Sequence, residues 1–418
     1  MKKSFISAVV VAIFLVGCGT ISSTPKTPNI NTYNTSSGAK NNKSTLGYPG
    51  SKDQKQPTTP EGTQPYTPES TTITSTAITA VDEKPTTPSE TTEQAPTNTP
   101  IIPMSLSQNG TMIKIAVLIP QKTIKKYAIT SVNSVMSYLL YRNYSFDMNV
   151  FNSNDEKDES ITKALADIKA GGYHFIIAPV TPIGAGLIAQ KVSDTVVFIP
   201  TVHKSALPNA GSNILFGGID YEQQMALLAP HANERVGIFE DGSGLSMQLS
   251  ALAKQNNSSR VFYEKRVENA KVNFKQLFQG NSSLSGASLY LNTPLVTSSL
   301  IASQLRANKI RPYALLSTQI NYNPMLLTLT QYEDRDDMFI ANSIQRAPAS
   351  LEETNALFGH DIVYDWVNYS TSIGIDLLAA HFFDSLGNRA FKENISNNQV
   401  VYNTTIVKPA PHAFTPAP

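Results

Sequence analysis

The chain has very little cysteine and histidine. Cys18 is the only cysteine among 418 residues, so the sequence allows no intrachain disulfide, no thiolate metal site and no cysteine nucleophile in the body of the protein. The six histidines show neither metal-ligand spacing nor an H-E-x-x-H motif. We therefore expect no metal centre, and a fold that is held together by burial of its core alone.

Clustered charge is also missing. Lys and Arg total 33 residues and Asp and Glu total 32, which gives a formal net charge of +1. Nucleic-acid binding relies on grouped basic residues that release counterions from the phosphates, and no such group occurs in this sequence. We expect no nucleic-acid partner.

Catalytic and cofactor motifs are incomplete. Residues 184–189, Gly-Ala-Gly-Leu-Ile-Ala, fit the dinucleotide pattern G-x-G-x-x-A, but no acidic residue ends the next expected strand to hold a ribose. Close packing of a helix on a sheet explains these glycines more simply. Residues 241–244, Asp-Gly-Ser-Gly, do not form the nucleophile elbow G-x-S-x-G. The sequence therefore favours a protein that is not an enzyme and uses no cofactor.

Apolar periodicity is missing from residues 19–103. This stretch consists largely of Thr, Ser, Pro, Asn and Gln, so it cannot bury enough apolar surface to offset the loss of chain entropy. We predict a disordered tether, which as a flexible coil would span roughly 50 Å. The alternative, a small β domain, lacks an alternating apolar run of sufficient length.

The first residues have the order of a secretory signal. Lys2 and Lys3 precede an apolar run at 5–16 that is short for a membrane span. Residues 15–18, Leu-Val-Gly-Cys, resemble a bacterial lipobox. That resemblance implies removal of residues 1–17 and acylation of Cys18, with palmitate among the expected chains. Because Gly19 is not the aspartate that retains lipoproteins at the inner membrane, the resemblance favours a periplasm-facing lipoprotein of the outer membrane. The alternative is an ordinary signal peptide with a chance cysteine.

From residue 113 onward, short apolar runs alternate with amphipathic segments. Continuous apolar strands that are separated by helices are typical of a parallel sheet covered on both faces, so the fold class is α/β. The expected strands lie at 113–120, 146–151, 173–179, 196–200, 213–218, 235–239, 260–266, 287–291, 313–316, 338–344 and 399–407. The main expected helices lie at 124–139, 161–168, 184–189, 221–232, 296–308 and 361–386, and a further helix begins near 243. Two consecutive series of this kind predict two lobes.

The order of these parts resembles the type I periplasmic-binding-protein fold of branched-chain amino-acid binding proteins. The landmarks of the resemblance are residues 115–120, 176–181, 198–201, 215–217, 236–241 and 300–309. The resemblance implies two Rossmann-like lobes that are joined by three crossing segments and close on a ligand in the cleft between them. It gives lobe 1 as 106–212 plus 345–386, lobe 2 as 213–344, and a C-terminal strand and tail at 387–418, after a lipidated linker at 18–105.

Candidate ligand-binding residues follow the expected strands, because ligands of α/β sheets meet the carboxyl ends of strands and the helix N-termini beside them. They are Thr181, Thr201 and His203 in lobe 1 and Asp241, Ser243, Asn292, Thr293, Ser317 and Gln319 in lobe 2. The resemblance implies that Thr181 and Thr201 bind a ligand carboxylate, and Asp241 is the candidate for its ammonium group. The alternative for every position is a turn or helix-cap residue.

Two functions remain open at this point. The first is recognition of a small polar, amino-acid-like solute for uptake or sensing. The second is an adaptor that contacts an envelope partner such as a peptidoglycan synthase, because some lipoproteins of this fold resemble penicillin-binding-protein activators. Long tethers favour the second function, whereas Thr181 and Thr201 favour the first.

Overall fold

A computed structural model describes residues 111–268 and 272–417. The expected signal peptide, the expected lipidation of Cys18 and the expected tether at 19–103 lie outside the described residues.

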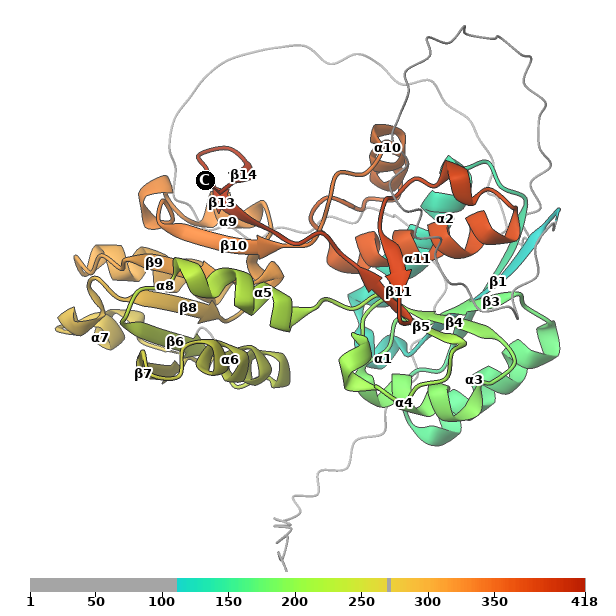
Figure 1. Cartoon of the computed structure of the whole chain (residues 1–418), viewed down its shortest axis with the longest axis horizontal. Coiled ribbons are helices and arrows are strands. Elements are labelled where there is room, and N and C mark those ends of the chain that lie inside the picture. Colours follow the sequence, from blue (N-terminus) through green and yellow to red (C-terminus); the bar gives the residue numbers. More distant parts are fainter. Residues whose placement is uncertain (1–110, 269–271, 418) are drawn as a thin grey trace, which may run out of the picture. The chain divides into compact units, whose positions relative to one another are not determined.

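The first lobe is built on a seven-stranded sheet with the order β11-β12-β5-β4-β3-β1-β2 (Figure 1). Its parallel strands are β1 (Ile113–Ile119), β2 (Phe146–Asn152), β3 (Phe175–Ile177), β4 (Val196–Ile199) and β5 (Ile214–Phe216). A hairpin from the end of the chain, β11 (Asn394–Ser396) and β12 (Gln399–Val401), extends the sheet beside β5. The sheet therefore combines segments from both ends of the described chain.

Helices cover both faces of this sheet. Alternate residues of β1 lie in different core clusters: Ile115 and Val117 in one, Ala116 and Leu118 in the other. The first cluster includes residues of α2 (Lys126–Tyr141) and α11 (Trp366–Phe382), and the second includes residues of α3 (Asp158–Gly171) and α4 (Pro182–Lys191). Burial on both faces is the reason that β1 is apolar at every position except Lys114. Two further helices of this lobe, α1 (Gln121–Ile124) and α10 (Ala349–Leu357), pack beside α2.

The second lobe has its own seven-stranded sheet, with the order β14-β13-β10-β9-β8-β6-β7. The parallel strands are β6 (Val236–Glu240), β7 (Val261–Arg266), β8 (Ser288–Asn292), β9 (Ala314–Ser317) and β10 (Met338–Asn342). The antiparallel hairpin of β13 (Thr405–Pro409) and β14 (Phe414–Pro416) extends it beside β10. The two lobes thus repeat one plan, which confirms the predicted two-lobed α/β fold.

Helices also pack on the second sheet. They are α5 (Tyr221–Leu228), α6 (Gly244–Asn256), α7 (Phe274–Phe278), α8 (Leu295–Ala307) and α9 (Met325–Leu329). Single turns of 3₁₀ helix occur in both lobes at Lys204–Ala206, Ala229–His231, Ser282–Leu284, Gln319–Asn321, Tyr332–Asp334 and Leu386–Asn388.

Three connecting segments carry the chain between the sheets: one from β5 to α5, one from β10 to α10 and one from β12 to β13. The strand at 214–216 pairs with β4 of the first sheet, so the chain leaves lobe 1 after Phe216 and not at the expected residue 213. Gly218 lies here against the backbone of Val202 and His203, and a Cβ atom on it would come within 2.2 Å of the His203 nitrogen. The first connecting segment therefore requires glycine at this position.

Two expected elements have different bounds. The strand expected at 399–407 is divided into β12 and β13, which belong to different sheets. The helix expected at 361–386 is α11, which begins at Trp366 because the Asp365 carboxylate accepts hydrogen bonds from the N–H groups of Val367 and Asn368. It ends at Phe382, shortly before Asp384 with a φ of 49°.

Candidate functional site

The sequence-predicted residues do lie at the carboxyl ends of strands. Thr181 follows β3, Thr201 follows β4 and Asp241 follows β6, while Asn292 and Ser317 are the last residues of β8 and β9. Each sheet therefore gathers its candidates along one edge, as parallel strands require. Their hydrogen-bond partners differ between the two lobes.

In the first lobe a carboxylate already occupies the start of α4. Glu156, from the loop after β2, accepts the N–H of Thr181 at 2.8 Å and the N–H of Gly184 at 3.1 Å. The Thr181 hydroxyl donates to the same carboxylate. The unpaired N–H groups and the dipole of a helix N-terminus favour an anion. Here the anion is a side chain of the protein itself.

Gly184 makes room for this arrangement. A Cβ atom at this position would lie 2.8 Å from the Glu156 carboxyl carbon, closer than real Cβ atoms approach other atoms. At Gly186 the nearest atom would be a Leu207 methyl at 3.7 Å, which is an ordinary contact. The first glycine of the 184–189 motif therefore serves the Glu156 contact, while the second is not needed for it.

The other candidates of this lobe hold the neighbouring loop together. The Thr201 hydroxyl donates to the carbonyl of Val180, which joins the loops after β3 and β4. The His203 Nδ1 lies 2.9 Å from the Ser205 hydroxyl, and its Nε2 lies 4.0 Å from the Asp220 carboxylate. These side chains stay partly exposed, so the first-lobe edge keeps contact with solvent.

In the second lobe, Asp241 and Ser243 organise the start of α6. The Asp241 carboxylate accepts the N–H of Ser243 at 2.9 Å, and the Ser243 hydroxyl accepts the N–H of Ser246 at 3.3 Å. The Ser246 hydroxyl in turn donates to the Asn292 carbonyl. Ser243 is thus an N-cap residue, which is the role that the alternative interpretation gave it.

The remaining second-lobe candidates are buried, and Thr293 and Ser317 belong to one hydrogen-bond network. The Asn292 amide instead donates to Ser250, and the Gln319 side chain accepts the Ser343 N–H. Asn292, Thr293 and Ser317 are 0% exposed and Gln319 is 6% exposed. Asn321, which the sequence analysis did not single out, is the centre of the network: its amide nitrogen lies 2.8 Å from the Ser317 hydroxyl and 2.9 Å from the Ser298 hydroxyl. It also donates to the carbonyls of Leu291 and Thr293. The side chains of this network bind one another and the ends of β8 and β9.

The rule that located Thr181 could also have located Glu156. Glu156 follows the end of β2, just as Thr181 follows the end of β3, and its side chain binds the start of α4. Its neighbour Asp155 has a pKa below its usual value, because it accepts hydrogen bonds from Ser160 and from the Lys157 N–H. The β2–α3 loop is therefore anchored by two acidic residues in succession.

Within residues 111–268 and 272–417, no group of three or more His, Cys, Asp or Glu side chains is arranged to hold a metal ion. In the same part of the chain no helix is both long and apolar enough to cross a bilayer.

No protein-family model matches the chain, and no curated protein matches it either. Several solved structures do match the chain. A putative branched-chain amino acid ABC transporter protein from Rhodospirillum rubrum has a TM-score of 0.57 at 10% identity, over 74% of this chain and 100% of that chain. The substrate-binding protein LivJ from Streptococcus pneumoniae, in complex with isoleucine, has a TM-score of 0.55 at 9% identity, over 72% and 97%. The chain has the type I periplasmic-binding-protein fold.

A third solved structure with this fold holds a different ligand. It is the solute-binding protein of an ABC transporter from Rhodopseudomonas palustris BisB5 in complex with 3,4-dihydroxybenzoic acid. Its TM-score is 0.54 at 13% identity, over 72% of this chain and 93% of that chain. The fold thus accommodates both an amino acid and an aromatic acid in these similar proteins.

Proposed function

We propose that this chain is a non-enzymatic, lipid-anchored binding protein that faces the periplasm and recognises a small polar solute at the carboxyl edges of its two sheets. The main supporting observation is the set of three donors at the start of α4, which converge on a carboxylate. A solute carboxylate would take the place of the Glu156 side chain, which lies on a loop and is partly exposed. The solute class is therefore a small amino-acid-like or other carboxylate-bearing molecule.

Thermal unfolding of the full chain in the presence of amino acids, amides and muropeptides tests this proposal. A bound solute raises stability by mass action, by about 2.7 kcal/mol at a hundredfold excess over Kd. Thr181→Val should abolish the shift because it removes one of the three donors. Thr162→Val, an exposed threonine on α3, is the matched control and should keep the shift. Absence of a shift with every solute would refute the solute function.

An adaptor function is the second candidate, and one observation favours it. The donors at the start of α4 are already satisfied by Glu156, and the buried hydroxyls of Thr293 and Ser317 have partners within the protein, so these groups need no ligand. An adaptor would contact an envelope partner, such as a peptidoglycan synthase, through its outer surface. Copurification of such a synthase with the wild-type chain, together with no thermal shift in the solute screen, would support this function in place of the first.

Lipid anchoring is part of the proposal and has its own test. Cys18→Ala should transfer the chain from the membrane fraction to the soluble fraction, because acylation of the only cysteine would be lost. Gly19→Asp should redirect the anchored chain from the outer to the inner membrane. Equal membrane association of wild type and Cys18→Ala would contradict the anchor.

A further inference from the structure

A cavity of about 860 Å³ lies against the β11–β12 hairpin and none of the residues discussed above as ligand-binding candidates lines it. Its walls come from three segments: residues 345–346, 390–397 and 401–403. The volume is in the range of small-molecule sites, which is roughly 300–1,000 Å³. The cavity is therefore large enough for a solute of its own.

Two cations line this cavity without a counter-ion. The side chains of Arg346 and Lys392 are exposed, and neither forms an ion pair or hydrogen bond with another residue of the described chain. The one carboxylate in the wall, Glu393, is buried and accepts the hydroxyl of Tyr369. The cavity wall thus carries an excess of positive charge.

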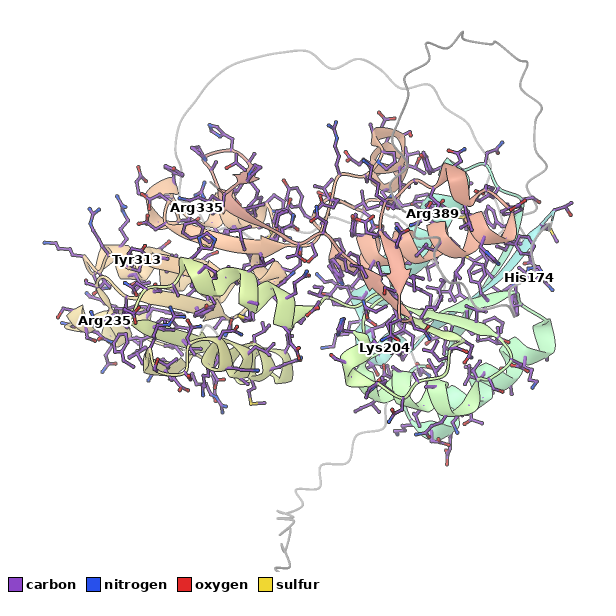
Figure 2. All side chains as sticks on the ribbon, in the orientation of Figure 1. His174, Lys204, Arg235, Tyr313, Arg335 and Arg389 are labelled. Atoms are coloured by element: carbon purple, nitrogen blue, oxygen red, sulfur yellow. The ribbon has the colours of Figure 1, made fainter. Side chains whose placement is uncertain are left out.

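The wall is held in place by other residues. Arg389 donates to the fully buried Asp376 at 2.9 Å and to the side chain of Asn394 at 3.0 Å, and it also donates to the Glu393 carbonyl. At the far end of the hairpin, the Lys204 ammonium donates to the Asn397 carbonyl at 2.8 Å. Arg389 and Lys204 come from different parts of lobe 1 (Figure 2). The hairpin backbone of the wall is therefore held in place before a ligand binds, and only the side chains of Arg346 and Lys392 have to become ordered.

The cavity also touches two of the three connecting segments. Gln345 belongs to the segment from β10 to α10, and Asn403 belongs to the segment from β12 to β13. The Gln345 side-chain amide donates to the Asn403 carbonyl at 2.7 Å, so the two segments are joined at the cavity wall. An occupant would contact the residues on which any movement between the lobes depends.

We propose that this cavity is a second binding site, which takes a small solute bearing a carboxylate or phosphate group between Arg346 and Lys392. Guanidinium and ammonium groups form charge-assisted hydrogen bonds with both kinds of anion, and Arg can bind either in bidentate geometry. The site is separate from the edge near Thr181 and stands whether or not that edge binds a solute.

Equilibrium dialysis of the full chain against succinate and, separately, inorganic phosphate at constant ionic strength tests the site. Trp366 supplies a second readout, because it is the only tryptophan and its ring lies 4.7 Å from that of Tyr402, between the lining residues Val401 and Asn403. Saturable binding of at least one probe, with a matching change in tryptophan fluorescence, is expected. Succinate binding alone would assign the site to carboxylates, and phosphate binding alone would assign it to phosphates.

Charge-matched variants make the test specific. Arg346→Gln with Lys392→Gln should weaken binding by about tenfold or more, which corresponds to the loss of at least one charge-assisted hydrogen bond. Lys163→Gln with Lys265→Gln removes the same charge from exposed positions elsewhere and should leave the affinity unchanged. All four side chains are exposed, so folding is not at risk. The proposal is wrong if neither probe binds at millimolar concentration, or if both double variants bind alike.

Discussion

The polar groups of the two carboxyl edges have different kinds of partner. At the first-lobe edge a single partly exposed side chain, Glu156, reaches from a loop to the start of α4. At the second-lobe edge Asn321, Ser298 and Ser317 form a network that is closed to solvent. The first arrangement can exchange its carboxylate for another, whereas the second can change only by local unfolding. The first-lobe edge is suited to the exchange of a bound carboxylate, and the second-lobe edge is suited to supporting the fold.

The largest loss of stability is expected when the buried network around Asn321 is disrupted. Asn321→Ala removes a donor with four acceptors, and it should lower the free energy of unfolding by about 3 kcal/mol because buried acceptors lose their partner. Chemical denaturation measures this loss. Asn149→Ala, on the exposed part of β2, is the control and should change stability by less than about 0.5 kcal/mol. Equal losses in the two variants would contradict the contrast between the edges.

A smaller loss of stability, together with a gain of acetate binding, is expected when Glu156 is replaced. Glu156→Ala leaves three donors without their carboxylate and should cost about 1–2 kcal/mol of stability. Free acetate should then restore part of this stability, because it can enter the vacated position. Glu159→Ala removes the same charge from an exposed position on α3 and should show no acetate dependence. Thermal unfolding at several acetate concentrations separates the two variants.

The glycines of α4 give a finer test. Gly184→Ala should cost about 1 kcal/mol, because its methyl group would lie 2.8 Å from the Glu156 carboxyl carbon and 3.0 Å from the Val180 Cβ, so that the Glu156 side chain must move. Gly186→Ala meets only an ordinary contact and should stabilise α4 by up to about 1 kcal/mol, since alanine favours helix more than glycine does. The two variants should therefore change the free energy of unfolding in opposite directions in the same denaturation experiment. A loss of equal size in both would show that packing of α4 alone, and not Glu156, requires Gly184.

The smallest expected effect is on the pH dependence of stability, through Asp155. The folded-state pKa of Asp155 is lowered, so its contribution to stability is present above its usual pKa of 3.8 and is lost as the pH falls through the folded value. Asp155→Asn should lower stability slightly near pH 7, where this contribution is fully present, and the difference from wild type should disappear as the pH falls below the folded pKa. Acid titration followed by circular dichroism measures the difference. A shift of the whole acid transition would mean that Asp155 matters more than its exposure indicates.

Much of the fold could be predicted from the sequence, because strands buried on both faces leave long apolar runs such as residues 113–119. The division of 399–407 into two strands could not be predicted. Residues 402–404 are compatible with a continuous strand, and the break depends on distant partners: Thr404 contacts Ser343, and Tyr402 donates to the Gly217 carbonyl. The local sequence pattern does not indicate such distant partners.

The positions of the candidate residues were predictable, but their surroundings were not. The rule that ligands meet the carboxyl ends of strands placed Thr181, Thr201 and Asn292 at the correct edges. It could not indicate that Asn292 would be fully buried, or that Glu156 would bind a helix 25 residues further along the chain. Both facts depend on which side chains the fold brings together.

The three connecting segments are tied to one another on both sides of the point where they cross. On the lobe 1 side, Tyr402 donates to the Gly217 carbonyl and Gln345 donates to the Asn403 carbonyl. On the lobe 2 side, the Thr404 hydroxyl contacts Ser343 and Gln223. Between these two sets of bonds lie at most five residues of each segment, among them Ile344 and Asp220. Any rotation of one lobe against the other must therefore be absorbed by a few backbone torsions, and the three segments must turn together as a single joint.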